Sequence, residues 1–280
     1  MIGSAYPYPR AAPDGMDKLW AVFLRDFRMA VSYGTNFWLS WISVAVDIGI
    51  AYFLGSLIAP STRFGFDGNV HSYFDYLVIN TAFLRFQSVA VTAFALAIRD
   101  GQTMGTLEVL LSTPSSIPFI VLSSGMYAFV YQLAQTFVYI GIAMLFGLNV
   151  SHANLLTLGV FIALMIAAVT PIGVIASSAA MALKKTGPIE FFLTSITQLF
   201  GGVYLPVAML PLGLREVGNL LPVTHALNGL RAALQGATVA QMWPDILWLC
   251  GLSAVFIPVS LFVFSAALNR AKVDGTLGLY

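Results

Sequence analysis

One long uncharged run limits what this chain can fold into. No Asp, Glu, Lys or Arg occurs between Glu108 and Lys184, so 75 consecutive residues carry no charge. A bilayer core about 30 Å thick is crossed by about 20 apolar residues in a helix. The run is therefore long enough for two membrane crossings, and it predicts a chain embedded in lipid.

The remaining composition supports this prediction. The chain is 59% hydrophobic and only 9% charged, whereas soluble domains carry about 25% charged residues. Its net charge of +1 gives no basic surface for nucleic acid. Cys250 is the single cysteine, which excludes an intrachain disulfide and a cysteine-rich metal site. We expect an all-α integral membrane protein.

Six apolar segments have the length of a transmembrane helix. They are residues 37–59, 76–98, 117–148, 155–183, 189–207 and 244–268. The Pro-containing residues 1–15 are expected to form a disordered cytoplasmic tail, and residues 16–280 a single transmembrane domain. These boundaries predict a six-helix topology.

The N-terminal part of that domain has an amphipathic pattern. Between Asp17 and Tyr33, aromatic and aliphatic residues follow one helical face, and Lys18, Arg25 and Arg28 lie on the other. A basic amphipathic helix of this kind lies in the membrane interface. We expect an interfacial helix before the first span.

The segment 208–243 precedes the last span and fits neither a loop nor two spans. It is too short and too rich in Pro and Gly for two crossings, yet it carries several leucines. Broken backbone is tolerated at membrane depth only where protein buries it. We expect a re-entrant helical hairpin at the outer surface.

The distribution of basic residues predicts the orientation. With the N-terminus in the cytoplasm, nine lie inside: Arg10, Lys18, Arg25, Arg28, Arg99, Lys184, Lys185, Arg270 and Lys272. Three lie outside: Arg63, Arg215 and Arg231. Six spans then return the C-terminus to the cytoplasm.

A polar segment, residues 99–116, separates the second and third spans. Leu107, Leu110 and Leu111 share one face of a short helix that Pro114 ends. The stretch GTLEVLLSTP, residues 105–114, resembles the GTLE-x-LL-x-TP signature of ABC-2 type transporter permeases, in which it forms the cytoplasmic coupling helix. The resemblance implies that these residues contact a separate ATPase subunit: Gly105, Thr106, Leu107, Glu108, Leu110, Leu111 and Pro114.

A second match follows about 90 residues later. The stretches FGGVYLP (200–206) and LPVTHAL (221–227) resemble the region before the last span of the same family. The residues that we assign to this re-entrant element are Gly201, Gly202, Pro206, Pro211, Pro222, His225 and Arg231.

The resemblance implies the permease subunit of an ATP-driven ABC exporter in the bacterial inner membrane. Such permeases pair as dimers, and each docks an ATPase subunit that drives alternating access. Their substrates are amphiphiles: drugs, lipids or lipid-linked glycans. Whether the second permease is a copy of this chain or a homologous one stays open.

The chain itself lacks an ATP site. A phosphate-binding Walker loop needs Gly directly before its Lys, but Asp, Leu, Lys and Ala precede the four lysines. ATP and magnesium are therefore expected in the partner subunit, with no cofactor or metal in this chain. His71, His152 and His225 are too scattered for a catalytic or metal site, so we expect no enzyme activity.

Two charges fall inside predicted spans. Asp47 lies in the first span and Arg85 in the second, where a charge near the bilayer centre costs about 2.5 to 3.5 kcal/mol or more. Their depths are similar because the two helices run in opposite directions. We predict an ion pair, with two roles left open: a lock between helices, or a polar site facing the cargo path or a second protomer.

Composition alone also allows an ion-driven secondary transporter, an intramembrane enzyme or a structural assembly protein. A secondary transporter is typically built from internal repeats, and no clear repeat relates the two halves of this sequence. An intramembrane enzyme needs paired catalytic residues at one depth, and Asp47 with Arg85 is not such a pair. The ion-driven transporter is the alternative to the exporter.

Overall fold

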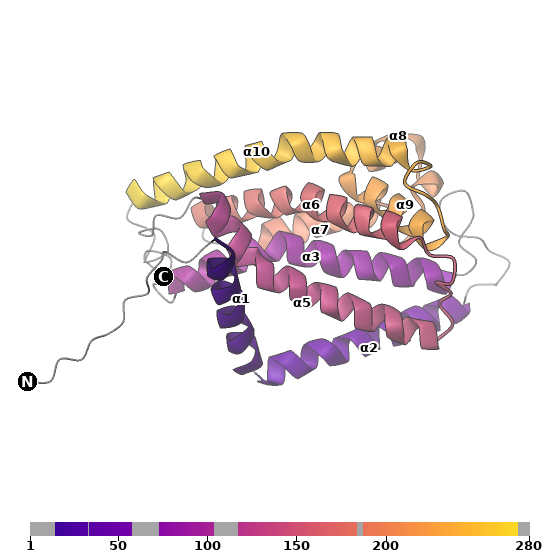
Figure 1. Cartoon of the computed structure of the whole chain (residues 1–280). Helices are drawn as coiled ribbons and strands as arrows, with labels where there is room; N and C mark the ends of the chain where they lie inside the picture. Colours follow the sequence, from indigo (N-terminus) through magenta and orange to yellow (C-terminus); the bar gives the residue numbers. More distant parts are fainter. Residues whose placement is uncertain (1–14, 33, 58–72, 104–116, 184–186, 274–280) are drawn as a thin grey trace, which may run out of the picture.

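A computed structural model describes residues 15–32, 34–57, 73–103, 117–183 and 187–273. Within this part of the chain all regular structure is helical (Figure 1). In chain order the helices are α1 (Gly15–Ser32), α2 (Gly34–Leu57), α3 (Tyr73–Thr103), α5 (Ile117–Leu145), α6 (Leu155–Leu183), α7 (Gly187–Phe200), the 3₁₀ helix η2 (Val207–Met209), α8 (Leu212–Leu220), α9 (Pro222–Leu234) and α10 (Trp243–Val273). The prediction of an all-α protein is confirmed for these residues.

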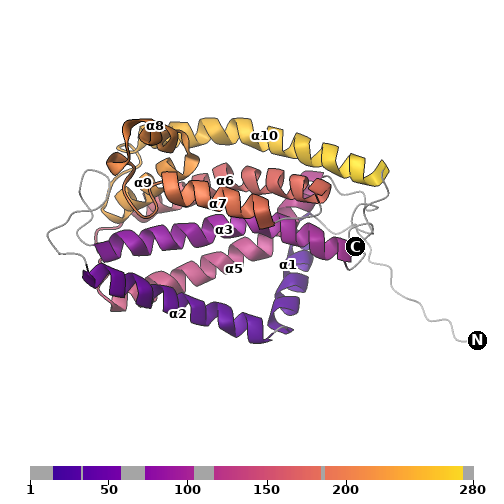
Figure 2. The ribbon, with the colours of Figure 1, turned by 180° about the vertical axis from the view of Figure 1, so that it is seen from behind.

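Five of the described helices are long and apolar enough to cross a membrane. Their apolar stretches are Phe37–Leu57, Tyr73–Phe94, Gly125–Leu145, Leu155–Ala179 and Trp243–Ala271. They lie lengthwise in one bundle, and α1 lies across one end of it (Figures 1 and 2). The C-terminal end of α10 lies at the end with α1, and α8 and α9 lie at the opposite end.

The centre of the bundle is α3. In its apolar stretch 67% of the residues are buried, against 17% in that of α2, so α3 is surrounded by protein and α2 is peripheral. Phe83 and Phe86 of α3 pack with Phe161 and Val169 of α6 in the main core cluster, which α9 and α10 complete. A smaller cluster of buried residues joins α2, α3 and α5.

Close helix contact in this core depends on a glycine. A Cβ on Gly173 of α6 would lie 1.9 Å from the backbone oxygen of Ala90 on α3. No side chain fits in that space, so Gly173 lets the two backbones approach directly.

Several predicted span boundaries agree with the helices, and the fifth does not. The helix α6 covers the predicted 155–183, whereas α3 continues past residue 98 to Thr103. The predicted fifth span, 189–207, contains residues 189–200 of the 14-residue helix α7, non-helical backbone over 201–206 and the first residue of η2. At about 1.5 Å per residue, α7 is about 21 Å long and shorter than the bilayer core.

The early end of α7 has a local cause. Gly202 adopts φ +74°, a conformation that L side chains rarely adopt. Pro206, four residues later, has no backbone N–H to continue a helix. The apolar character of 201–207 suggested a longer helix, but these backbone preferences end it.

The segment 208–243 forms two short helices after η2. α8 is largely exposed, and α9 is buried along most of its length, with Ala226 and Leu227 at 0% exposure. The end of α9 also holds the α5–α6 turn, because the Asn154 N–H donates to the Ala233 carbonyl at 2.8 Å. α9 is thus part of the protein core at this end of the bundle.

The predicted amphipathic helix corresponds to α1. Phe23 and Phe27 pack on Tyr127 of α5, with ring centroids 5.9 and 6.5 Å apart, and Trp20 is 59% exposed. Its apolar face is therefore only partly covered by the bundle.

Candidate functional site

The predicted coupling segment lies mostly outside the described residues. Residues 99–103 are the last residues of α3, and the structure describes none of the seven predicted coupling residues: Gly105, Thr106, Leu107, Glu108, Leu110, Leu111 and Pro114. The helix α3 ends, and α5 begins, at the end of the bundle where α1 lies (Figure 1).

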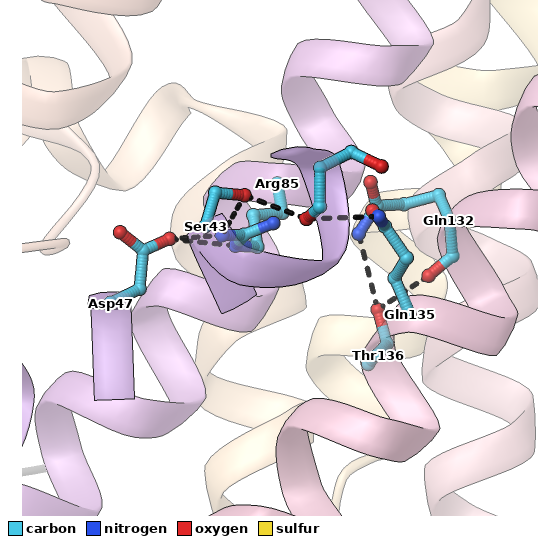
Figure 3. Close-up of polar contacts among 7 residues, drawn as sticks. Ser43, Asp47, Arg85, Gln132, Gln135 and Thr136 are labelled. Atoms are coloured by element: carbon cyan, nitrogen blue, oxygen red, sulfur yellow. Dashed lines mark hydrogen bonds and ion pairs between the residues drawn. The ribbon is translucent and has the colours of Figure 1, made fainter. Parts of the chain in front are cut away.

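Asp47 and Arg85 lie together near the middle of the apolar stretches of α2 and α3. Arg85 Nε donates to Asp47 Oδ2 at 2.8 Å, and Arg85 Nη2 donates to the same oxygen (Figure 3). Nη2 also donates to Ser43 Oγ at 3.2 Å. The charges of two helices are thus neutralised within one contact.

Polar side chains of α5 continue this contact along the same face of α2, one turn before Ser43. Gln135 Nε2 donates to the Ser40 carbonyl at 3.3 Å, and the Ser40 hydroxyl bonds the Tyr131 hydroxyl at 2.6 Å. Gln132 and Gln135 are buried, and Thr136 donates to the Gln132 carbonyl at 2.9 Å (Figure 3). We call this set the polar seam: Ser40, Ser43, Asp47, Arg85, Tyr131, Gln132, Gln135 and Thr136.

The polar seam is not fully covered by its own protomer. The Arg85 side chain is 16% exposed, and that of Asp47 is 35% exposed. Both hydrogen bonds from Arg85 reach Oδ2 of Asp47, and Oδ1 accepts no hydrogen bond from the described residues. A carboxylate oxygen that is exposed at membrane depth is unfavourable against lipid.

The predicted re-entrant residues gather at the other end. Their places are the link after α7 (Gly201, Gly202), the residues preceding η2 and α8 (Pro206, Pro211), the first turn of α9 (Pro222) and the body of α9 (His225, Arg231). Pro222 begins α9, where its missing N–H leaves no helix bond unmade.

Arg231 is the most deeply buried charge of this group, with 3% exposure. Its Nη2 donates to the Asn80 side-chain oxygen and to the Gly202 carbonyl, both at 2.6 Å, and Nε donates to Asn80 at 3.1 Å. Its guanidinium carbon lies 4.4 Å from the Tyr76 ring centre. Burial lowers the pKa of Arg231, but an arginine stays charged in proteins. A cation therefore connects α9 to α3 and to the link after α7.

His225 connects α9 to the last helix. Its Nδ1 lies 2.6 Å from Asp245 Oδ1, and its Nε2 lies 2.8 Å from the Asn219 carbonyl. Burial opposes protonation, but the Asp245 carboxylate and the Asn219 carbonyl outweigh it and raise the pKa of His225 above 6.5. Both ring nitrogens face acceptors, an arrangement that only the protonated ring satisfies fully.

Several partners in these contacts were not singled out from the sequence, among them Asn80, Gln135 and Asp245. Asn80 and Gln135 are neutral residues within apolar spans, which is a weak but readable sign of a buried hydrogen bond. Asp245 was a stronger sign of a polar contact, because a carboxylate in the first turn of a span can bind a neighbouring cation. In the described part of the chain no three metal-ligating side chains are grouped.

These features define the class of the protein: a multi-pass α-helical membrane protein with polar contacts between its helices. Residues 60–262 match the family described as ABC-2 family transporter protein. The match covers more than half of the chain, so the chain belongs to the ABC-2 transporter family, and the resemblance found in the sequence is confirmed. Permeases of this family in general pair with an ABC ATPase subunit. A comparison with curated proteins finds no match.

Proposed function

We propose that this chain is the permease subunit of an ATP-driven exporter that moves an amphiphile out of the cytoplasm or the inner leaflet of a bacterial inner membrane. The family match over residues 60–262 carries the proposal. The chain has no Gly-Lys pair for a Walker loop, so ATP and magnesium act in a separate subunit.

The coupling step is assigned to residues 105–114. The segment joins α3, the central helix, to α5. A displacement of the segment by the ATPase subunit would therefore be transmitted to the core of the bundle. Leu107, Leu110 and Leu111 supply an apolar face, and Glu108 a charge, for a soluble partner. Closure of two ATPase subunits on ATP would then change which side the path opens to.

The topology that we propose keeps six crossings and cytoplasmic termini. α6 ends at the α1 end of the bundle and α10 begins at the opposite end (Figures 1 and 2). The chain between them must return across the bundle, and α7 with the link 201–206 makes that return. The segment 208–243 then forms the re-entrant element at the outer surface, as its Pro and Gly residues together with its leucines suggest.

The open edge of Asp47 supports pairing of two permeases. An exposed carboxylate oxygen at membrane depth is unfavourable against lipid and acceptable in a polar path or an interface. We therefore assign the polar seam to the side of the protomer that faces the path or the second permease. The pair itself holds α2 to α3 in either case.

Transport in inverted vesicles tests this function. The chain is expressed with an ABC ATPase encoded beside it, and efflux of a fluorescent phospholipid into the vesicles is followed with ATP and a proton ionophore present. The exporter requires ATP and is insensitive to the ionophore. Transport that needs an ion gradient and proceeds without the ATPase would establish the ion-driven alternative. Vesicles with an ATPase lacking its Walker lysine are the control.

A further inference from the structure

A row of aromatic rings leads from α1 to the polar seam. Trp20 and Phe23 of α1 stack with ring centres 5.4 Å apart, and Phe23 lies 5.9 Å from Tyr127 of α5. Tyr127 stacks on Tyr131 at 5.7 Å, and Trp41 of α2 lies 5.8 Å from Tyr131. We call these five residues the aromatic row. It connects the end of the bundle where α1 lies (Figures 1 and 2) to the seam near the middle of α2.

The rings of the aromatic row are not sealed inside the protein. Trp20 is 59% exposed, and Phe23, Trp41, Tyr127 and Tyr131 are each partly exposed. An aromatic ring carries partial negative charge on its face, so this surface attracts cations as well as apolar groups. In the proposed topology the α1 end is cytoplasmic, so the rings extend from the side on which an exporter loads its cargo.

At the seam the row reaches the carboxylate of Asp47. Ser40, which bonds the Tyr131 hydroxyl, and Asp47 are seven residues apart and therefore lie on one face of α2. The free oxygen, Oδ1 of Asp47, points away from Arg85 (Figure 3). The Asp47 side chain is 35% exposed against 16% for Arg85, so the negative member of the pair is the more accessible one.

We propose that the aromatic row and Asp47 bind the cargo, and that the cargo is an amphiphile whose polar end is a protonated amine. The amine N–H donates to Asp47 Oδ1, and the apolar part lies on the rings of Trp41 and Tyr131. An anion is repelled by the accessible carboxylate, and a neutral amphiphile leaves Oδ1 without a cationic partner. The inference rests on the proposed function, because it names the class of cargo that the exporter moves.

Binding of a radiolabelled amine to the purified full-length chain tests this site without the ATPase. The chain is held in phosphatidylcholine nanodiscs, and binding to empty nanodiscs is subtracted. The probe is propranolol, a naphthyl ether whose secondary amine is protonated at neutral pH. Two competitors keep the naphthyl ether and lack the amine: 1-ethoxynaphthalene is neutral, and 1-naphthoxyacetate is an anion. We expect saturable binding, with both competing at least about tenfold more weakly than unlabelled propranolol.

Other results would overturn the proposal. Equal competition by 1-ethoxynaphthalene would show that the rings bind without recognising charge. Stronger competition by 1-naphthoxyacetate would show that the site prefers the opposite charge, and absence of saturable propranolol binding would show that there is no amine site.

A failure of the amine site is distinguishable from a failure of the exporter. ATP-driven uptake into inverted vesicles is measured for the fluorescent phospholipid and for propranolol. ATP-driven uptake of the phospholipid without saturable propranolol binding retains the exporter and rejects the amine site. Saturable propranolol binding without ATP-driven uptake of either compound retains the binding site and rejects the exporter.

Matched variants locate the binding. Asp47→Asn together with Arg85→Gln removes the carboxylate without leaving an unpaired cation, so this chain should fold and bind propranolol at least about tenfold more weakly. Trp41→Leu should weaken binding about threefold to tenfold because ring surface is lost. Trp243→Leu, the same change at an exposed residue that begins α10, is the control and should bind as the wild type does. Undiminished binding by the folded double variant would overturn the assignment.

Discussion

Arg85 on α3 donates through two nitrogens to a single carboxylate oxygen of Asp47 on α2, and the second carboxylate oxygen accepts nothing from the described residues. This pair joins the most central long helix to the most exposed one. It therefore adds a polar contact to the apolar cluster that joins α2 to α3 and α5.

The first prediction concerns this pair. Asp47→Ala and Arg85→Ala should each lower the free energy of unfolding by about 3–5 kcal/mol, because the remaining charge is left alone. The double variant should recover most of that loss. The measurement is thermal unfolding in detergent for the four chains, and Arg25→Ala, which breaks the exposed Arg25–Asp26 pair, should cost at most about 1 kcal/mol.

Transport by the double variant separates the two roles of the pair. Recovery of both stability and transport assigns it a structural role. Recovery of stability without transport assigns it to the path or the protomer interface, as the open edge of Asp47 suggests. Single variants whose effects simply add show that the two residues are not coupled.

The second prediction concerns Glu108 in the coupling segment. Glu108→Lys should reduce co-purification of the ATPase and uncouple ATP hydrolysis from transport, because it reverses a charge at the proposed docking surface. Membrane insertion should not change. Glu216→Lys, the same charge reversal on exposed α8 at the other end of the bundle, is the control and should couple normally. Equal coupling in both variants would remove Glu108 from the mechanism.

The third prediction concerns Gly173. Its Cβ would meet the Ala90 carbonyl at 1.9 Å, whereas one on Gly159 of the same helix meets nothing within 4 Å. Gly173→Ala should therefore destabilise the protein by about 1–3 kcal/mol through overpacking. Gly159→Ala should be neutral or stabilise it by up to about 1 kcal/mol. Thermal midpoints of the two variants test this, and similar midpoints would mean that α3 and α6 do not pack this closely.

The fourth prediction is a pH dependence from His225. Since its pKa is raised above 6.5 in the folded state, the contact with Asp245 contributes fully below about pH 6.5. The contribution is lost as the pH rises through the raised folded-state value. The thermal midpoint of the wild type should thus exceed that of His225→Gln most in acid. A contribution of about 1 kcal/mol corresponds to about 2–4 °C in thermal midpoint.

Asp245→Asn gives a second measure of the same contact. It removes the carboxylate, so its midpoint should also differ from that of the wild type in acid and converge with it in base. A difference that grows as the pH rises would contradict the pairing in which His225 carries the charge.

The sequence predicted the long helices well because their signal is strong. An uncharged run limits where spans begin and end, and α6 occupies the expected residues 155–183. The pairing of Asp47 with Arg85 was predicted because a charge inside an apolar span is costly unless an opposite charge lies beside it. Both inferences rest on free-energy costs that are large and local.

Other features could not be read from the pattern. The end of α7 depends on the positive φ of Gly202. The sequence does not show whether a glycine in an apolar stretch ends a helix. The acceptors of Arg231 are a carbonyl and Asn80, which lies 151 residues earlier in the chain. Contacts with neutral groups at such separations leave no periodicity in the sequence, so Arg231 was assigned to the re-entrant element at the outer surface without a prediction of its burial or partners.

The last prediction concerns the topology of 208–243. In a chain carrying Cys250→Ala, which removes the only and exposed cysteine, single cysteines are placed at exposed Leu212 and Gln241 and at buried Ala226. An impermeant thiol reagent should label the two exposed positions from outside only, because six crossings put this end of the bundle on the outer face. Ala226→Cys should react only after denaturation, and Arg28→Cys on α1 only from the cytoplasm. Labelling of Leu212→Cys or Gln241→Cys exclusively from the cytoplasm would mean that the chain crosses the membrane within this segment, and the six-crossing topology would be wrong.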